Sequence, residues 1–272
     1  LVSNSLPAYF LGLAIGQLIY GPISDRIGRR TPLIFGLSLH IVASILCIYA
    51  DSLSTLLIVR VLQAFGSCVG LVLARAAIRD VLDTASAAKA FASMMIVMGL
   101  APILAPMFGA WILTFFPWQA IFITLAVIGV ICWLCVHFFF KESLPVERRL
   151  NLSLYQVTTL YAAILKDESF RRPMFAGCLT GAALFCYISS ASAVFMGQYG
   201  LSQQQFSYAF ALNAGGIMLM SSLNKHLNTR MDIFPRLRLG GTIQCFGALI
   251  VVSAGLMNHA PLWLLMSGLF LV

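Results

Sequence analysis

Long apolar stretches recur along the chain, and they constrain its fold more than any other feature. Most are close to the roughly 20 residues that a helix needs to cross a bilayer. The chain is 60% hydrophobic and 10% charged with a mean hydropathy of +0.94, whereas soluble domains carry about 25% charged residues. The sequence predicts an all-α membrane protein with about nine transmembrane helices, at residues 5–22, 32–50, 55–78, 90–114, 118–140, 172–195, 204–223, 239–257 and 261–272.

Basic residues fall in alternate connections between these stretches. The connections at 51–54, 114–117, 197–203 and 258–261 contain no Lys or Arg, while those between them are basic. By the positive-inside rule the basic connections are cytoplasmic, and the first stretch runs inward. The net charge of +8 therefore indicates membrane topology, and no nucleic-acid partner is expected.

The first dense cluster of charge is the sequence Gly-Pro-Ile-Ser-Asp-Arg-Ile-Gly-Arg-Arg at residues 21–30. We expect a short aqueous loop here, with Pro22 ending the first helix and glycines allowing a tight turn. A generic cytoplasmic loop explains the arginines and glycines. It does not explain an acid in the order Gly-x-x-x-Asp-Arg-x-Gly-Arg-Arg, formed by Gly21, Asp25, Arg26, Gly28, Arg29 and Arg30.

This order resembles the signature loop between the second and third helices of the major facilitator superfamily. Residues 16–22, Gly-Gln-Leu-Ile-Tyr-Gly-Pro, resemble more narrowly the Bcr/CflA transporters, named for bicyclomycin and chloramphenicol resistance. The resemblance implies two pseudo-symmetric halves of six helices, so the nine stretches would be helices 2 to 10 of a longer protein. It divides the chain into an N-terminal half (1–140), a cytoplasmic linker with an amphipathic helix (141–171) and a truncated C-terminal half (172–272).

Arg60 is a basic residue deep inside an apolar stretch. Placing arginine in the hydrocarbon centre costs about 2.5–3.5 kcal/mol, so the side chain either reaches the outer headgroups or faces a cavity and pairs there with a carboxylate or a substrate. Arg60, Gln63 and Gly66 resemble the helix 4 motif of the superfamily, whose arginine is implicated in proton-coupled transport. None of the nine acids lies mid-membrane, so the coupling carboxylate is expected in a helix outside this sequence.

Three further positions extend the predicted site. Asp80, at the inner end of the same stretch as Arg60, would face Arg29 and form a relay with Asp25; the resemblance implies that this relay latches one conformation, the alternative being three screened surface charges. Pro102, Pro106 and Gly109 resemble the helix 5 antiporter motif, with alanine in place of two of its glycines. Asn213 is expected to line a cavity or to form a hydrogen bond between helices.

The sequence lacks the residue patterns that metal binding, nucleotide binding or catalysis would need. Seven cysteines and four histidines are scattered without metal-ligand spacing, and no Gly-x-x-x-x-Gly-Lys-Ser/Thr sequence is present, so no metal, cofactor or nucleotide is expected. No intramembrane cluster of nucleophiles indicates an enzyme.

The interpretation is an inner-membrane secondary transporter that exports small amphipathic drugs in exchange for protons, by rocker-switch alternating access. Its partners would be the drug or metabolite, protons and the lipid bilayer, and a monomer is expected. The alternative is a major facilitator dedicated to a single metabolite.

Overall fold

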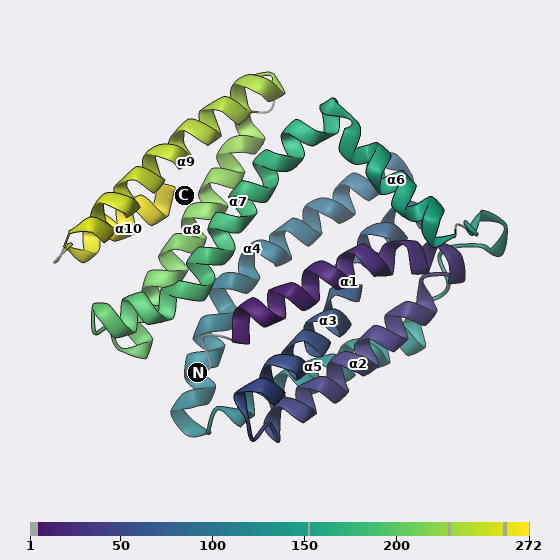
Figure 1. Cartoon of the computed structure of the whole chain (residues 1–272), viewed down its shortest axis with the longest axis horizontal. Coiled ribbons are helices and arrows are strands. Elements are labelled where there is room, and N and C mark those ends of the chain that lie inside the picture. Colours follow the sequence, from purple (N-terminus) through teal and green to yellow (C-terminus); the bar gives the residue numbers. More distant parts are fainter. Residues whose placement is uncertain (1–4, 152, 228–229, 258–259, 272) are drawn as a thin grey trace. The chain divides into compact units, whose positions relative to one another are not determined.

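The computed structural model describes residues 5–151, 153–227, 230–257 and 260–271, without the side chains of residues 99, 102, 103, 154, 221, 224–226, 233 and 234. Within these ranges every regular element is helical (Figure 1), which confirms the all-α expectation. The elements are α1 (Ser5–Ile27), α2 (Arg30–Ile48), α3 (Leu53–Val81), α4 (Thr84–Phe115), α5 (Gln119–Phe139), η2 (Val146–Arg148), α6 (Leu154–Lys166), α7 (Glu168–Ser192), η3 (Ala193–Gln198), α8 (Gln203–Leu227), α9 (Ile233–Leu256) and α10 (Leu262–Leu271).

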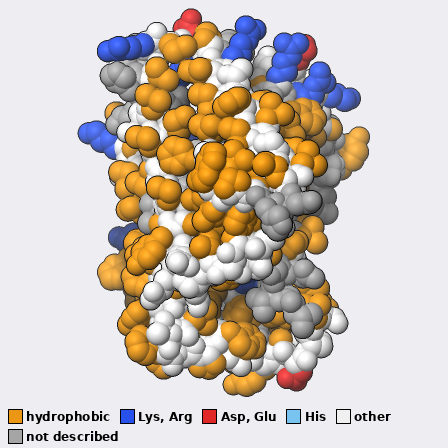
Figure 2. Space-filling model, turned by 90° about the vertical axis from the view of Figure 1, so that its left-hand side faces the viewer, with side chains coloured by type: hydrophobic (Ala, Val, Ile, Leu, Met, Phe, Trp, Pro, Cys, Tyr) orange, Lys and Arg blue, Asp and Glu red, His pale blue; other side chains and the backbone are white. Residues whose placement is uncertain are grey.

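Six of the apolar stretches are long helices, as predicted. Six candidate spans are long and apolar enough to cross a membrane among the described residues: α1, α2, α3, α5, α7 continued by η3, and Pro235–Leu256 of α9. Thr84–Met98 and Leu104–Phe115 within α4, and α10, are shorter apolar helices. Hydrophobic side chains dominate the face drawn in Figure 2, as expected for helices that have lipid rather than water around them.

The charged segment 21–30 is mostly helix, so the expectation of a ten-residue loop was wrong. Helix α1 continues to Ile27 and contains Pro22, and α2 begins at Arg30. The chain reverses within two residues because Gly28 adopts a positive φ of 100°, which costs glycine little. Pro22 does not end α1, because a proline in a helix removes one hydrogen bond and that bond is replaced. The hydroxyl of Tyr161 donates to the Leu18 carbonyl, four residues before Pro22, at 3.1 Å.

Contacts between Cα atoms divide the chain into two compact units, one formed by Leu1–Ser93 with Ile112–Leu179 and the other by Met94–Trp111 with Thr180–Val272. In the first unit α3 packs against α1 and α2, and α2 also packs against α5; these helices lie side by side in Figure 1. Its main core contains Tyr20, Leu33, Cys68, Val69 and Leu73. The predicted division at residues 140 and 171 stays a prediction.

Glycines bring α2 and α3 together closely. A Cβ atom at Gly66 would lie 2.6 Å from both the Gly36 carbonyl oxygen and the His40 nitrogen, a distance that real Cβ atoms do not tolerate. The backbones therefore meet directly at this point. This contact fixes the height of His40 on α2 relative to Gln63 on α3.

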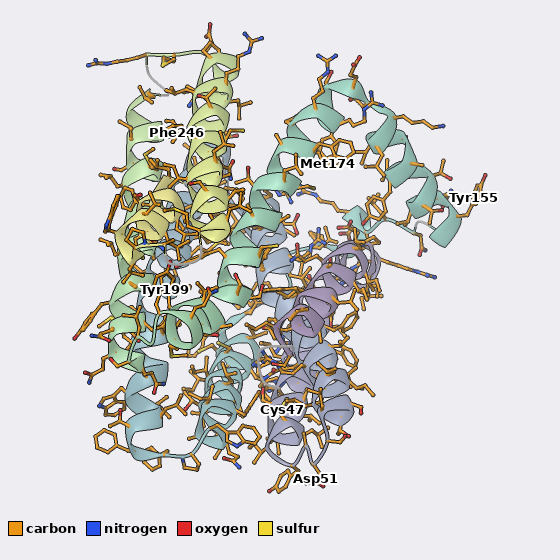
Figure 3. All side chains as sticks on the ribbon, turned by 60° about the vertical axis from the view of Figure 1, so that its left-hand side comes forward. Cys47, Asp51, Tyr155, Met174, Tyr199 and Phe246 are labelled. Carbon is orange, nitrogen blue, oxygen red and sulfur yellow. The ribbon has the colours of Figure 1, made fainter. Side chains whose placement is uncertain are left out.

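The segment that follows α5 stays in the first unit and leads into α6. Helix α6 begins with a capping box: the Ser153 hydroxyl accepts from the Gln156 amide, and the Gln156 side chain accepts from the Ser153 amide. Tyr155 projects away from α6 (Figure 3) and is 79% exposed. Tyr161, two turns later, is partly buried through its contact with α1.

The second unit has its own core, formed by Ala191, Phe195, Phe210, Ala254 and Leu265. Helix α10 packs against α8 and α9, and η3 contacts α8. A second capping box precedes α8, where Ser202 and Gln205 exchange hydrogen bonds.

Candidate functional site

Arg29 is the centre of the first polar cluster, which we call the turn cluster (Ser24, Asp25, Arg29, Asp80 and Glu142). Its guanidinium contacts Asp25 Oδ1 at 2.5 Å through Nη1 and Asp80 Oδ2 at 2.8 Å through Nε. Nη1 also donates to the Ser24 hydroxyl at 2.6 Å. Arg29 is 6% exposed. The contacts predicted among Asp25, Arg29 and Asp80 are thus present, and their role in transport stays a prediction.

Charge compensation explains why Arg29 can be buried. Burial would lower the pKa of its guanidinium, but the hydrogen bonds and negative charges of Asp80 and Asp25 outweigh burial and raise the pKa above its ordinary value. Two helices supply the acids, because Asp25 is one turn before Arg29 and Asp80 lies in the last turn of α3. The cluster therefore joins the α1–α2 turn to the end of α3.

Glu142 closes the turn from outside it, and sequence reasoning missed this residue. Its carboxylate accepts from the backbone amides of Arg29 at 2.8 Å, Arg30 at 3.2 Å and Leu144 at 3.0 Å. Burial raises the pKa of the Glu142 carboxyl, and the three hydrogen bonds together with Arg149 more than offset this, so the net pKa is lowered. The first amides of a helix have no partner within it and attract anions. The unpaired amides at the start of α2 were the feature that could have indicated an acidic partner.

The turn accepts only glycine at position 28. Besides its positive φ, a Cβ atom there would overlap the Glu142 carboxylate and approach the Arg149 guanidinium. The other two arginines of segment 21–30 also form hydrogen bonds within the protein. Arg26 donates to Asn151 Oδ1 at 3.1 Å, and Arg30 donates to the His137 carbonyl at 2.8 Å. Gly21 lies inside α1, where a Cβ atom would meet nothing within 4 Å.

Arg60 is the centre of a second cluster, the Arg60 cluster (Tyr9, Ser44, Arg60, Gln63 and Phe122). Its guanidinium carbon lies 4.5 Å from the ring centroid of Tyr9 and 5.6 Å from that of Phe122. Nη1 donates to Gln63 Oε1 at 2.6 Å. Gln63 is fully buried and in turn donates from Nε2 to the Ser44 hydroxyl at 2.7 Å.

The charge of Arg60 has no carboxylate partner among the described residues, in which the ion pairs of arginine involve Arg29, Arg149 and Arg172. Its Nε atom is buried without a hydrogen bond. Aromatic faces attract a cation by about 0.5–2 kcal/mol, and a hydrogen bond to a charged group adds about 1.5–3 kcal/mol. These contacts hold the guanidinium seven residues into α3, and the buried Nε has no partner among the described residues. The sequence predicted that Arg60 either reaches the outer headgroups or pairs in a cavity with a carboxylate or a substrate. Pairing with a carboxylate is not present among the described residues.

The other predicted residues lie elsewhere. Asn213 is 4% exposed and donates to the Tyr187 hydroxyl at 2.9 Å, within the second unit. Its Oδ1 atom is buried without a partner among the described residues. Pro106 and Gly109 lie in α4, where a Cβ atom at Gly109 would meet nothing within 4 Å of the described structure. The side chain of Pro102 lies outside the described residues.

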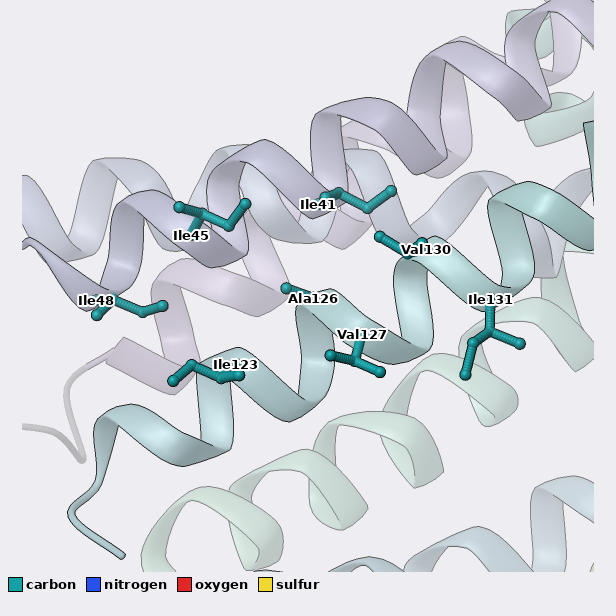
Figure 4. Close-up of a pocket in the computed structure, with 8 residues that line it drawn as sticks. All are labelled: Ile41, Ile45, Ile48, Ile123, Ala126, Val127, Val130 and Ile131. Atoms are coloured by element: carbon teal, nitrogen blue, oxygen red, sulfur yellow. The ribbon is translucent and has the colours of Figure 1, made fainter.

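A groove of about 360 Å³ between α2 and α5 is not a substrate site of the usual kind (Figure 4). It is lined by Ile41, Ile45, Ile48, Ile123, Ala126, Val127, Val130 and Ile131. Ligand sites combine apolar walls with a few polar groups that orient the ligand, and this lining offers none. The groove is suited to lipid chains.

Comparisons with known proteins identify the family of this chain. The family model described as Major Facilitator Superfamily matches residues 2–272. The uncharacterized MFS-type transporter YdgK of Bacillus subtilis is 35% identical over all of this chain and 68% of its own length. The bicyclomycin resistance protein homolog of Haemophilus influenzae is 27% identical over 94% of the chain and 65% of that protein. Multidrug resistance protein D of Escherichia coli is 31% identical over 78% of the chain and 52% of that protein.

A solved structure shows the same fold. The human organic anion transporter MFSD10 superposes on 99% of this chain and 65% of its own chain, with a TM-score of 0.66 and 18% identity. The chain thus spans between about half and two thirds of the length of these proteins. It is a multi-pass membrane protein of a transporter family rather than an enzyme, and it resembles the bicyclomycin resistance branch as its sequence indicated. This chain belongs to the major facilitator superfamily.

Proposed function

We propose that the protein exports small amphipathic drugs across the bacterial cytoplasmic membrane in exchange for protons. Two of the relatives described above are named for drug resistance, and export is the direction that such a name favours. The proton gradient would supply the energy without a bound cofactor. The basic connections would face the cytoplasm, and the protein would work as a monomer.

The observation that carries this proposal is the unbalanced charge of Arg60. A permanent cation held in an apolar span by two rings and an amide is available to an anionic partner. Its counter-charge would come from the substrate or from a carboxylate elsewhere in the whole protein. If this partner changed between protonated and ionised forms, the occupancy of the site would follow the proton gradient.

The turn cluster would bias the conformations between which the transporter alternates. Asp25, Arg29 and Asp80 join two segments that are distant in sequence, and such a network has different energies in two arrangements of its helices. A bias of about 1–3 kcal/mol changes populations by about 5- to 150-fold. We propose that the cluster stabilises one state of a rocker-switch cycle and weakens in the other.

The test measures proton release from the purified full-length protein in unbuffered detergent solution. Bicyclomycin, chloramphenicol and a panel of metabolites are added one at a time, and binding of each is measured separately by calorimetry. Release with several unrelated drugs is the expected result. Release with one metabolite would instead indicate a dedicated transporter. Binding of several compounds without any proton release would overturn proton exchange.

A further inference from the structure

His40 lies near the middle of a span, ten residues from the first residue of α2 and eight from its last. At 1.5 Å per residue it is about 15 Å from Arg30 along the helix axis, which is half the ~30 Å thickness of the hydrocarbon layer. Ionisable groups at this depth are costly and usually functional. The glycine contact between Gly66 and the His40 backbone fixes its position.

The imidazole ring of His40 lies between α3 and α5. Nδ1 lies 3.3 Å from the Gln63 carbonyl oxygen of α3, and because a carbonyl oxygen only accepts, Nδ1 is the donor in this contact. The opposite edge of the ring faces α5, where a Cβ atom at Gly129 would lie 3.0 Å from Cδ2 and 3.7 Å from Nε2. Nε2 is then the nitrogen to which a proton can add, because a neutral imidazole has one N–H and the imidazolium ion has two.

The charges around the ring come from one helix. Arg60 on α3 is the charged residue that acts on His40. Helix α5 contains no Asp, Glu, Lys or Arg, and its titratable groups besides His137 are the thiols of Cys132 and Cys135. Helix α2 adds the Cys47 thiol, and α1 places Tyr9 against Arg60. A proton on His40 therefore adds a second positive charge beside one that no described carboxylate balances.

Gln63 connects the two cations. Its carbonyl faces His40, and its side chain accepts from Arg60. A second path runs through Ser44, which receives a hydrogen bond from Gln63 and donates to the His40 carbonyl at 2.7 Å. Movement of the His40 ring or of the Arg60 guanidinium therefore changes the hydrogen bonds of Gln63.

We propose that His40 binds an exchanged proton and that its protonation is coupled to Arg60 through Gln63. This inference rests on the proton-exchange function proposed above. The proton comes from water, adds to the unprotonated ring nitrogen and leaves from it, so no bond between heavy atoms changes. Two positive charges in one apolar layer repel each other. An anionic partner of Arg60 favours the protonated ring, so a drug that displaces this partner favours release of the proton from His40, which is the condition for exchange.

Histidine NMR tests the site without reference to transport. The whole protein, labelled with ¹⁵N-histidine and placed in lipid nanodiscs, is titrated between pH 5 and 9, and the His40 resonances are assigned as those lost in His40→Gln. We expect both ring nitrogens to be protonated at the acidic end and one at the alkaline end. The midpoint should move to higher pH by about half a unit or more in Arg60→Gln, because a repelling charge is removed.

One tautomer throughout the pH range, or a midpoint that is the same in Arg60→Gln, would overturn the inference. The matched control is His137→Gln. His137 is an exposed histidine that stacks on Trp133 at 4.8 Å near the end of α5, and its bond to Arg30 uses the backbone carbonyl, which the substitution keeps. This control should leave the His40 titration unchanged.

Drug-induced proton release then separates the two proposals. His40→Gln should release at least about twofold fewer protons per drug bound than the parent, while His137→Gln matches the parent. If His40 titrates and responds to Arg60 but the parent releases no proton with any bound drug, proton exchange fails and the His40 site remains. If release is normal and unchanged in His40→Gln, exchange stands and His40 is not its proton carrier.

Discussion

Two arginines of the same unit, one buried and one half-buried, are stabilised in opposite ways. Arg29 lies at the end of its helices and contacts two carboxylates and a hydroxyl. Arg60 lies inside a span and contacts two aromatic rings and one amide. The compensated charge of Arg29 stabilises the fold, because removing the arginine or its carboxylates leaves the opposite charge unpaired. An uncompensated charge contributes little to folding, and its presence in the chain points to function.

The largest stability effect is expected for Arg29→Met, which removes the compensated charge. Asp80 and Asp25 would face each other without a cation, and breaking a buried ion pair costs about 3–5 kcal/mol. Because Asp25 is 39% exposed, we expect a loss of about 3 kcal/mol in the free energy of unfolding, measured by denaturation in mixed detergent micelles. An unchanged unfolding curve would show that the turn cluster contributes no stability.

The matched change at the second arginine, Arg60→Met, should leave stability within about 1 kcal/mol of the parent. The cost of a central arginine, about 2.5–3.5 kcal/mol, is close to the sum of its cation–π and hydrogen-bond contacts. Drug transport should nevertheless fall by about a hundredfold, which is ~2.7 kcal/mol in transition-state terms. The same unfolding assay and a vesicle transport assay check both parts. Equal destabilisation by the two substitutions would remove the contrast between the arginines.

How far the sequence predicted these clusters depends on the range of the interaction. Arg60 and Gln63 are three residues apart on one helix, so their contact follows from helical periodicity. The contact of Asp80 with Arg29 was predicted from a family resemblance. Tyr9 and Phe122 could not be assigned to Arg60, because apolar helices carry many aromatic residues and periodicity does not say which helix lies beside which. Each of the nine predicted stretches coincides with a helix, because apolar length is a local property. Six of these helices are long and apolar enough to cross a membrane among the described residues, and the first continues past its predicted end.

Substituting the two acids of the turn cluster separately should give a graded result. Asp80 is 18% exposed and Asp25 is 39% exposed. Since hydrogen bonds to charged groups contribute about 1.5–3 kcal/mol when buried and exposed pairs under about 1 kcal/mol, Asp80→Asn should cost about 1–2 kcal/mol and Asp25→Asn less than 1. Asp25→Asn should still reduce transport with little change in expression. Parental turnover in Asp25→Asn would exclude the proposed latch.

Acid should weaken the turn cluster through Glu142. Because the pKa of folded Glu142 is below its ordinary value of 4.5, its contribution is fully present above about pH 4.5 and is lost as the pH falls through the folded value. In Glu142→Gln this part of the pH dependence should disappear, at about 1 kcal/mol or less. Unfolding measured from pH 7 to 3.5 checks this, with the exposed Glu147→Gln as the control. A parental pH dependence in Glu142→Gln would contradict it.

Glu142 and Tyr161 were missed because both act on backbone groups of distant helices. The chain contains nine acids and eight tyrosines, and nothing in their own neighbourhoods distinguishes these two. What distinguishes them is the need of their partners: the first amides of α2 and the carbonyl that Pro22 leaves without a donor. A search of the sequence for unsatisfied backbone groups would have predicted both requirements, though not which side chains meet them.

The smallest effect is expected at the Leu18 carbonyl, where the hydrogen bond joins two uncharged groups. In Tyr161→Phe the Leu18 carbonyl loses the hydroxyl at 3.1 Å that replaces the missing proline amide. A neutral hydrogen bond contributes about 0.5–1.5 kcal/mol, and this one is partly exposed, so we expect about 0.5–1 kcal/mol in the unfolding assay. Tyr155→Phe is the control, because Tyr155 lies on the same helix and is 79% exposed. Hydrogen exchange should rise for amides near Pro22 in Tyr161→Phe only. If both variants behaved alike, α6 would not be docked on α1 by this bond, and the stability of the turn region would come from its charged contacts alone.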